Sequence, residues 1–268
     1  MSIGFVTGAT DGIGLHTARK LAASGSFHTL LIHGRDAARL LKAKERIETG
    51  SGVRVETFQA DFSDLAQVKS MCEKILDRYS DTGIGPIVNN AGVFSKEACV
   101  TGDGFELTYQ VNVLASHIVS GMLHPIAKGK IIHVASISAS SSVDLDAYRT
   151  GSILTRPYSA HRTYSDSKLL NVMQACAYAE RLRGKVVVQS LDPGTVNTKM
   201  LAAGWGMCGI PVSSADNQFS LAMRGGDTGE YFVGDRPARY PSAQCTDEQS
   251  LASLCQMLME HTAVAAPI

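Results

Sequence analysis

The sequence contains no long hydrophobic run and no closely spaced pair of cysteines. None of its apolar segments approaches the roughly 18 residues that are needed to cross a bilayer. The first ten residues, MSIGFVTGAT, lack the basic start and the long apolar stretch of a signal peptide. The six cysteines are scattered and form no Cys-x-x-Cys motif. We therefore expect a cytoplasmic protein with reduced thiols, without a disulfide framework and without a metal site.

An excess of charge of either sign is also missing. The 268 residues include 25 basic and 25 acidic side chains, and apolar residues make up 44%. This balance gives no reason to expect nucleic acid or an anionic membrane as a partner. No linker rich in proline or glycine, no repeat and no low-complexity tract divides the chain. We expect a single domain over residues 1–268.

What the sequence does contain is an alternation of strand-like and helix-like stretches. Short apolar runs rich in β-branched residues predict seven strands, at Ile3–Thr7, Thr29–His33, Val53–Gln59, Ile84–Asn89, Lys130–Ala135, Val186–Leu191 and Tyr231–Val233. Strands separated by helices pair in parallel, with helices on both faces of the sheet. The predicted fold class is α/β: a single doubly wound Rossmann-type domain with a seven-stranded, mainly parallel sheet. Such sheets bind ligands at the carboxyl ends of their strands.

Apolar residues recur every three or four positions between several of these runs. They predict a helix over residues 65–79, another from about 168 to 182, and a third near the C-terminus. Thr246, followed by Gln249, can form a capping box at the start of this last helix.

The first predicted strand ends in a glycine-rich turn, TGATDGIG, which begins at Thr7. Glycines at such a turn (Gly8, Gly12 and Gly14) let the backbone approach a pyrophosphate, and the following helix N-terminus offers it N–H groups. The spacing Gly-x-x-x-Gly-x-Gly differs from the commonest dinucleotide fingerprint. A plain turn between strand and helix is the alternative.

The second predicted strand runs into Arg35 and Asp36. An acidic residue here would bind the ribose 2′-hydroxyl of NAD, whereas an arginine would bind the 2′-phosphate of NADP. Arg35 comes first, where its guanidinium can fork onto phosphate, and Asp36 is suited to the start of the next helix. We expect NADP(H) in preference to NAD. The alternative for Arg35 is a solvated surface side chain.

Two further strand ends carry polar residues. Asp61-Phe62 follows the third strand, where a carboxylate can accept the adenine amino group or simply cap a loop. Asn89-Asn90-Ala91-Gly92 closes the fourth strand and suits tight packing beneath a cofactor, although it would also make an ordinary turn.

Tyr164 precedes Lys168 by four residues, and residues four apart share one face of a helix. A nearby ammonium favours the phenolate and would lower the tyrosine pKa from its usual value of about 10. Such a side chain exchanges protons near neutral pH, as a general acid–base must. An ordinary solvated pair is the alternative, and Tyr158 with Arg162 shows that the spacing is common.

Ser136 and Asn112 are two further candidates. Ser136 follows the fifth strand, where its hydroxyl can hold a carbonyl oxygen, or it merely begins a serine-rich loop. Asn112 is expected in mid-helix, where asparagine is unfavourable. Holding a water, bending the helix and facing solvent are the three explanations for it.

Together these stretches resemble the short-chain dehydrogenase/reductase family over most of the chain. The resemblance is carried by Thr7-Gly8-x-x-x-Gly12-Ile13-Gly14, Asp61, Asn89-Asn90-Ala91-Gly92, Asn112, Ser136, Tyr164-x-x-x-Lys168 and Asp192-Pro193-Gly194-x-Val196-x-Thr198. It implies hydride transfer between NAD(P) and a carbonyl or alcohol carbon, without a metal.

The resemblance also implies residue roles. Tyr164 would donate a proton to the carbonyl and Ser136 would polarise it. Lys168 would bind the nicotinamide ribose and lower the tyrosine pKa, and Asn112 would hold a water of the proton relay. Further cofactor contacts are implied for Thr10, Asp11, Ile13, Phe62, Asn90, Ala91, Gly92, Pro193, Gly194, Val196 and Thr198.

Within the family, the eight residues from Tyr164 to Asn171 resemble the corresponding segment of retinol dehydrogenases, their relatives and protochlorophyllide reductase. The segment between Ser136 and Tyr164 is longer than in compact members. An insertion is therefore expected at about 138–160, either as a lid or as packing over the helical face that many members use to dimerise. Residues 199–226 begin with an apolar, glycine-rich stretch that holds the only tryptophan, and predict a substrate lid or a core-packing connection.

The function expected from the sequence is that of an NADP-preferring oxidoreductase acting on a carbonyl/alcohol pair of a lipophilic small molecule. An NADP(H)-sensing regulatory protein without turnover is one alternative. A reductase of a conjugated carbon–carbon double bond is another. Both a monomer and a homodimer are compatible with the sequence.

Overall fold

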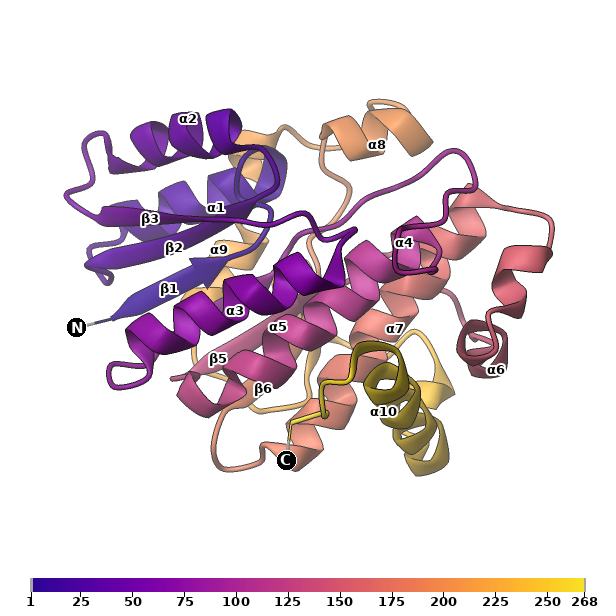
Figure 1. Cartoon of the computed structure of the whole chain (residues 1–268). Helices are drawn as coiled ribbons and strands as arrows, with labels where there is room; N and C mark the ends of the chain where they lie inside the picture. The colour runs from indigo at the N-terminus through magenta and orange to yellow at the C-terminus, as the bar shows by residue number, and fades with distance from the viewer. Residues whose placement is uncertain (1, 268) are drawn as a thin grey trace.

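An eight-stranded sheet forms the centre of the computed structural model, which describes residues 2–267 (Figure 1). The strand order is β3-β2-β1-β4-β5-β6-β7-β8, and all neighbouring pairs are parallel except β7 and β8. The strands are β1 (Ile3–Val6), β2 (Thr29–Gly34), β3 (Arg54–Gln59), β4 (Ile87–Asn89), β5 (Lys130–Val134), β6 (Val187–Asp192), β7 (Tyr231–Val233) and β8 (Arg236–Ala238). The predicted doubly wound α/β fold is confirmed, with one strand more than expected.

Helices cover both faces of this sheet (Figure 1). The helices α1, α2 and α9 pack on one face, and α3, α5 and α7 pack on the other, where α10 lies against α7. The α-helices are α1 (Gly12–Ala23), α2 (Ala37–Glu48), α3 (Leu65–Tyr79), α4 (Leu107–Tyr109), α5 (Ala115–Leu123), α6 (Leu145–Arg149), α7 (Ala160–Arg181), α8 (Lys199–Gly204), α9 (Asn217–Met223) and α10 (Glu248–Thr262). None of the helices within residues 2–267 has the length and apolar character that a membrane span requires.

Several element boundaries differ from those predicted. The strand β4 begins at Ile87 because Pro86 before it has no N–H to donate, and α7 begins at Ala160, where Ser159 caps it. The capping-box prediction for α10 was wrong: the Asp247 carboxylate accepts a hydrogen bond from the Ser250 N–H at 2.8 Å, and Thr246 lies before the cap.

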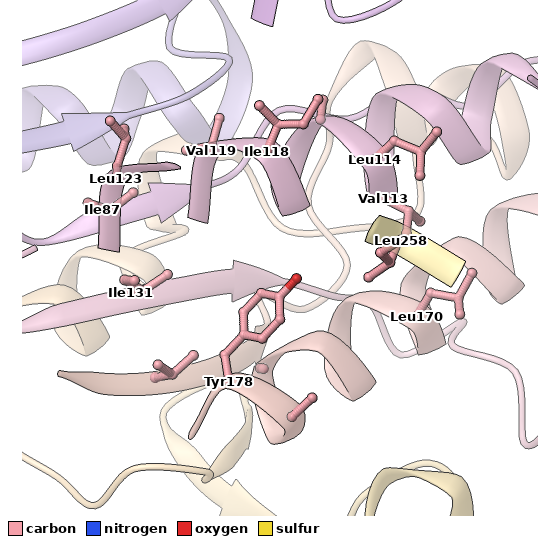
Figure 2. Close-up of a cluster of buried hydrophobic side chains, with 14 of the residues drawn as sticks. Ile87, Val113, Leu114, Ile118, Val119, Leu123, Ile131, Leu170, Tyr178 and Leu258 are labelled. Atoms are coloured by element: carbon pink, nitrogen blue, oxygen red, sulfur yellow. The ribbon is translucent and has the colours of Figure 1, made fainter. Parts of the chain in front are cut away.

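Buried apolar side chains join the sheet to the helices on the α5 and α7 face. Figure 2 shows Ile87 and Ile131 from the strands, Val119 from α5 and Leu170 from α7 in one cluster. Leu258 of α10 belongs to the same core and is fully buried. The last helix is therefore an integral part of the domain.

The predicted insertion at 138–160 is packed against the body of the domain. It contains α6, whose Tyr148 is buried with its ring centroid 4.8 Å from that of Tyr109. The Arg149 guanidinium donates to the Ser253 carbonyl of α10 at 2.9 Å. The Tyr158 hydroxyl donates to the Ser95 carbonyl at 2.7 Å. These contacts favour the packing explanation over a freely moving lid.

Truncating Leu254 on the buried face of α10 should destabilise the whole domain. Leu254 is fully buried, so Leu254→Ala should lower the free energy of unfolding by about 3 kcal/mol. Met259→Ala is the control, because Met259 is 47% exposed on the same helix and should cost less than about 0.5 kcal/mol. Denaturant unfolding of both variants measures the difference. Equal losses would contradict the packing of α10 described here.

Candidate active site

A cleft of about 350 Å³ opens at the carboxyl ends of the strands. It is lined by most of the residues for which the sequence predicts cofactor contacts, namely Gly8, Thr10, Asp11, Gly12, Ile13, Gly14, Arg35, Asp61, Phe62, Asn90, Ala91, Gly92, Tyr164, Lys168, Pro193 and Thr198. Gly194 and Val196 do not line it. The Gly194 N–H donates to Asp192 Oδ1 at 3.0 Å, and Val196 is buried in a bridge to Ile210.

The glycine-rich turn makes one wall of the cleft, and its glycines are required by the backbone. Gly8 and Gly12 have φ of 65° and 53°, which side chains rarely adopt. A Cβ on Gly8 would lie 2.8 Å from the Ala91 Cα, and one on Gly14 would lie 2.5 Å from the Gly8 carbonyl oxygen. Asp11 caps α1 by accepting from the Gly12 N–H at 2.9 Å. The turn thus carries no side chain at its glycines, so a pyrophosphate can approach the backbone at the N-terminus of α1.

Asn90 fastens the end of β4 to this turn. Its side-chain Nδ2 donates to the Thr7 carbonyl at 2.8 Å, while the Thr7 hydroxyl accepts from the Asn90 and Ala91 N–H groups at 3.0 and 2.9 Å. Its Oδ1 accepts from Gln218 Nε2 of α9 at 3.0 Å. The amide group of Asn90 therefore joins three segments beneath the cleft.

Arg35 and Asp36 occupy different environments after β2. Arg35 is exposed and lines the cleft, and within residues 2–267 its guanidinium has no hydrogen-bond or ion-pair partner. Asp36 caps α2 by accepting from the Arg39 N–H at 2.8 Å, as the sequence favoured. Asp61 accepts from the N–H and hydroxyl of Ser63 and so caps a loop, but it also lines the cleft.

His33 is a residue that the sequence analysis missed. Its Nδ1 accepts from the Gly8 N–H at 3.2 Å, and its Nε2 donates to the Ala60 carbonyl at 3.0 Å. Its ring stacks on Phe62 with centroids 4.0 Å apart. Burial lowers the pKa of His33 to about 4, so the ring is neutral at pH 7 with its proton on Nε2. This imidazole holds the glycine-rich turn and the end of β3 in register.

Lys168 is buried on α7. Its Nζ donates to the Val134 carbonyl at the end of β5 at 3.0 Å and lies 5.5 Å from the centre of the Tyr164 ring. Burial lowers the pKa of Lys168 to about 8, and the negative charge of Asp192 opposes this effect. The side chain is therefore still mainly an ammonium at pH 7.

Tyr164 is buried beside Ser136, and its pKa differs from the expectation. Burial raises the pKa of Tyr164 to about 12, a hydrogen bond with Ser136 partly opposes the rise, and Asp192 adds to it. The predicted lowering of the Tyr164 pKa by Lys168 is not seen in this structure, where loss of hydration has the largest effect and Lys168 contributes none. Tyr164 accordingly keeps its proton at neutral pH.

Asn112 lies in a π-helical turn, Gln110–Leu114, between α4 and α5. Its Oδ1 accepts from the Val93 N–H at 2.8 Å, and its Nδ2 donates to the Val93 carbonyl at 3.1 Å and to the Ser167 hydroxyl at 3.0 Å. Such turns often occur at functional sites. The side chain connects the bend in the helix to the loop after β4 and to α7.

Asp192, at the end of β6, is a second residue for which no role was predicted from the sequence. It is 1% exposed, and within the described chain its Oδ2 has no hydrogen-bond partner. Burial raises the pKa of Asp192, whereas N–H groups of the neighbouring loops and Lys168 lower it. Its only signal in the sequence was its place before Pro193-Gly194.

A comparison with protein families agrees with this arrangement. A family model described as short chain dehydrogenase matches residues 3–205. The chain belongs to the short-chain dehydrogenase/reductase family. This is the family that the motifs of the sequence resemble.

Several curated proteins are 27 to 34% identical to this chain over the residues that align with it. A Streptomyces protein named as a daunorubicin C-13 ketoreductase is 34% identical over 73% of this chain and 66% of its own length. Human retinol dehydrogenase 11 is 30% identical over 73% of this chain and 61% of its own length. The chain thus spans about two thirds or less of these two relatives. The predicted likeness to retinol dehydrogenases is confirmed.

Solved structures show the same fold. An uncharacterised protein from Mycobacterium paratuberculosis superposes with a TM-score of 0.82 at 22% identity, covering 100% of this chain and 96% of its own. An NADPH-bound carbonyl reductase from chicken fatty liver gives 0.67 at 21% identity, covering 87% and 96%.

Replacing His33 should weaken the protein in a pH-dependent way. His33→Leu leaves the Gly8 N–H without its acceptor, so the free energy of unfolding at pH 7 should fall by about 1–3 kcal/mol. The native pKa of about 4 lies below the unfolded value near 6.5, so protons favour the unfolded state as the pH falls. The wild type should therefore lose about 3 kcal/mol from this group between pH 6.5 and 4, which the variant does not lose.

Denaturant unfolding at several pH values between 7 and 4.5 measures this difference. His28→Leu is the matched control, because His28 is exposed, and it should follow the wild type. If the free energies of unfolding of the wild type and His33→Leu differed by the same amount at every pH in that range, His33 would not be held neutral.

Proposed function

We propose that this protein is an NADP(H)-preferring enzyme that transfers a hydride between nicotinamide and a carbonyl or alcohol carbon of a lipophilic small molecule. The observation that carries the proposal is the buried pair Tyr164 and Lys168 at one end of a cleft with a glycine-rich turn at the other. Ser136, which is half-buried and does not itself line the cleft, is hydrogen-bonded to Tyr164. A binding protein without turnover has no need of a buried proton donor beside an ammonium.

The residues of the cleft fit a dinucleotide phosphate. The glycine-rich turn can pack against Ala91 and Asn90 only because Gly8 and Gly14 have no Cβ, and this packing shapes the backbone wall of the cleft. Arg35 offers an unpaired guanidinium at the edge of the cleft, and Lys199 adds a second cation. A 2′-phosphate beside Arg35 accounts for a free guanidinium better than a 2′-hydroxyl does. NADPH, when bound, supplies the hydride to the carbonyl carbon.

The chain's own residues would then complete the reduction. Tyr164 is protonated at pH 7 and gives its hydroxyl proton to the carbonyl oxygen. The Ser136 hydroxyl donates a hydrogen bond to the same oxygen and stabilises the developing alkoxide. The Lys168 ammonium holds the ribose and stabilises the tyrosinate that remains. Asn112 would hold a water for the proton's return.

The relatives support a lipophilic carbonyl or alcohol as the substrate. Their names describe a ketoreductase of daunorubicin and dehydrogenases of retinol. Apolar side chains within the predicted lid agree with this, since Met207 and Ile210 are both exposed. Residues 199–209 are proposed as the moving part, because α9 is joined to α1 through Thr17 and Gln218.

Removing the tyrosine hydroxyl should abolish turnover without abolishing cofactor binding. Tyr164→Phe should lower kcat about 100-fold or more, because the proton donor is lost. The dissociation constant for NADPH, measured by calorimetric titration, should change less than about threefold, because the phenyl ring keeps its packing. Tyr240→Phe, on the loop before α10, is the control. Wild-type turnover by Tyr164→Phe would refute this mechanism, and tight NADPH binding without turnover of any carbonyl in the wild type would favour a sensor.

Removing Arg35 should weaken NADPH binding selectively. Arg35→Ala should raise the NADPH dissociation constant about 10- to 100-fold, because loss of one charge-assisted hydrogen bond has an effect of this size. The dissociation constant for NADH should stay nearly unchanged. Arg236→Ala is the control, because Arg236 lies on the exposed strand β8. Calorimetric titration of both variants with NADPH and with NADH measures these dissociation constants. Equal effects on NADPH and NADH would refute the proposed contact with the 2′-phosphate.

A further inference from the structure

An aromatic cluster lies against Tyr164 and does not line the cofactor cleft. It consists of Phe94, His161 and Trp205. The centroids of Phe94 and Trp205 lie 5.7 and 5.3 Å from that of Tyr164, at angles of 70° and 62°. Phe94 and His161 lie 4.9 and 5.0 Å from Trp205. The indole therefore contacts three rings, one of which is the proposed proton donor, although 37% of Trp205 is still exposed.

Trp205 is carried by a segment that is fixed at its base. We call residues 199–209 the flap. Asn197 holds its far end through two hydrogen bonds with the Gly209 backbone, at 2.7 and 2.8 Å. Thr198 caps α8 at its near end. No residue of α8 is buried, and Figure 1 shows this helix at the periphery of the molecule.

Few contacts hold the flap against the body of the domain. His161 Nε2 donates to the Gly204 carbonyl at 3.1 Å, and a Cβ on Gly204 would lie 3.2 Å from the Phe94 ring. Lys199 pairs with Asp11 at 2.7 Å, but its side chain is 85% exposed and such pairs contribute little. The rings around Trp205 therefore supply most of the attachment, and the flap can move as one piece about Asn197 and Thr198.

Lifting the flap would leave a slot where the indole now lies. The slot would be bounded by Phe94, His161 and Tyr164, whose rings now meet the indole at 51°, 87° and 62°, and it would be open to solvent on one side. Aromatic rings pack against each other in tilted and edge-to-face geometries that a puckered saturated ring cannot reproduce. Because the indole lies 5.3 Å from the Tyr164 ring, a ring that replaced it would lie beside the proposed proton donor.

We propose that the substrate is an aryl carbonyl compound, whose flat ring replaces the Trp205 indole in this slot. The proposal rests on the proposed function and specifies its substrate class. The carbonyl carbon would gain its new C–H bond from a hydride, which brings its own electron pair and would be supplied by NADPH, leaving NADP⁺. The C=O π pair moves to the oxygen, which takes the Tyr164 proton. The product is the corresponding aryl carbinol.

A matched pair of ketones tests the proposal. Acetophenone and cyclohexyl methyl ketone have the same carbon skeleton, and their kcat/KM values are measured by NADPH oxidation. The acetophenone ring is flat and conjugated with the carbonyl, which makes that carbonyl the less electrophilic of the two, so a preference for acetophenone reflects recognition of the ring. The kcat/KM of the wild type should be about tenfold or more higher for acetophenone than for cyclohexyl methyl ketone. One or two aromatic contacts would produce a ratio of this size. Phe94→Leu keeps an apolar side chain but removes one wall, and should reduce the preference several-fold. Phe219→Leu, on α9 outside the slot, should keep the wild-type ratio.

The possible outcomes separate this proposal from the proposed function. Turnover of both ketones at equal kcat/KM, or an unchanged ratio in Phe94→Leu, would overturn the aryl slot and leave the reductase intact. Absence of turnover with every ketone in a protein that binds NADPH would overturn both.

Trp205 is the only tryptophan, so its fluorescence reports the flap directly. With NADP⁺ bound, the unreactive mimic benzamide should shift the emission to the red as the indole moves into water. Cyclohexanecarboxamide at the same concentration should give no shift. Equal shifts with the two amides, or none with either, would contradict replacement of the indole by a flat ring.

Discussion

The buried ammonium of Lys168 is the constraint on which the site depends. A charge taken out of water is costly unless it is paired and hydrogen-bonded. The Val134 carbonyl binds the ammonium directly, and the carboxylate of Asp192 opposes the loss of its proton. Lys168 can therefore be both buried and charged only while β5, β6 and α7 remain together. One helical turn earlier, Tyr164 is held against Ser136 by the same three elements.

The other end of the cleft is organised by neutral contacts. His33 links the Gly8 N–H to the Ala60 carbonyl, so the ends of β2 and β3 and the glycine-rich turn keep a fixed relation. Asn90 does the same for β4 and the turn. These bonds are buried or half-buried, and breaking one leaves a polar group without a partner. The open backbone of the turn is thus prepared for an anion before one binds.

The sequence predicted the strand ends and the residues around the cleft because apolar runs mark buried parallel strands and glycines mark a close backbone approach. It could not predict β8, whose exposed Arg236-Pro237-Ala238 carries no apolar signal, or the cap at Asp247, one residue after Thr246. The high pKa of Tyr164 depends on burial by Phe94 and Trp205, which lie far away in sequence. The roles of His33 and Asp192 likewise arise only when separate strand ends meet.

The measurement that tests the central claim most directly is the fate of deuterium from NADPH labelled at the nicotinamide C4. Benzylideneacetone offers a ketone and a conjugated double bond in one molecule, and mass spectrometry with NMR locates the label in its product. Our account predicts an allylic alcohol with deuterium on the carbinol carbon. Deuterium on the β-carbon of a saturated ketone would show that the enzyme reduces the double bond, and would contradict carbonyl reduction by the Tyr164 and Ser136 pair.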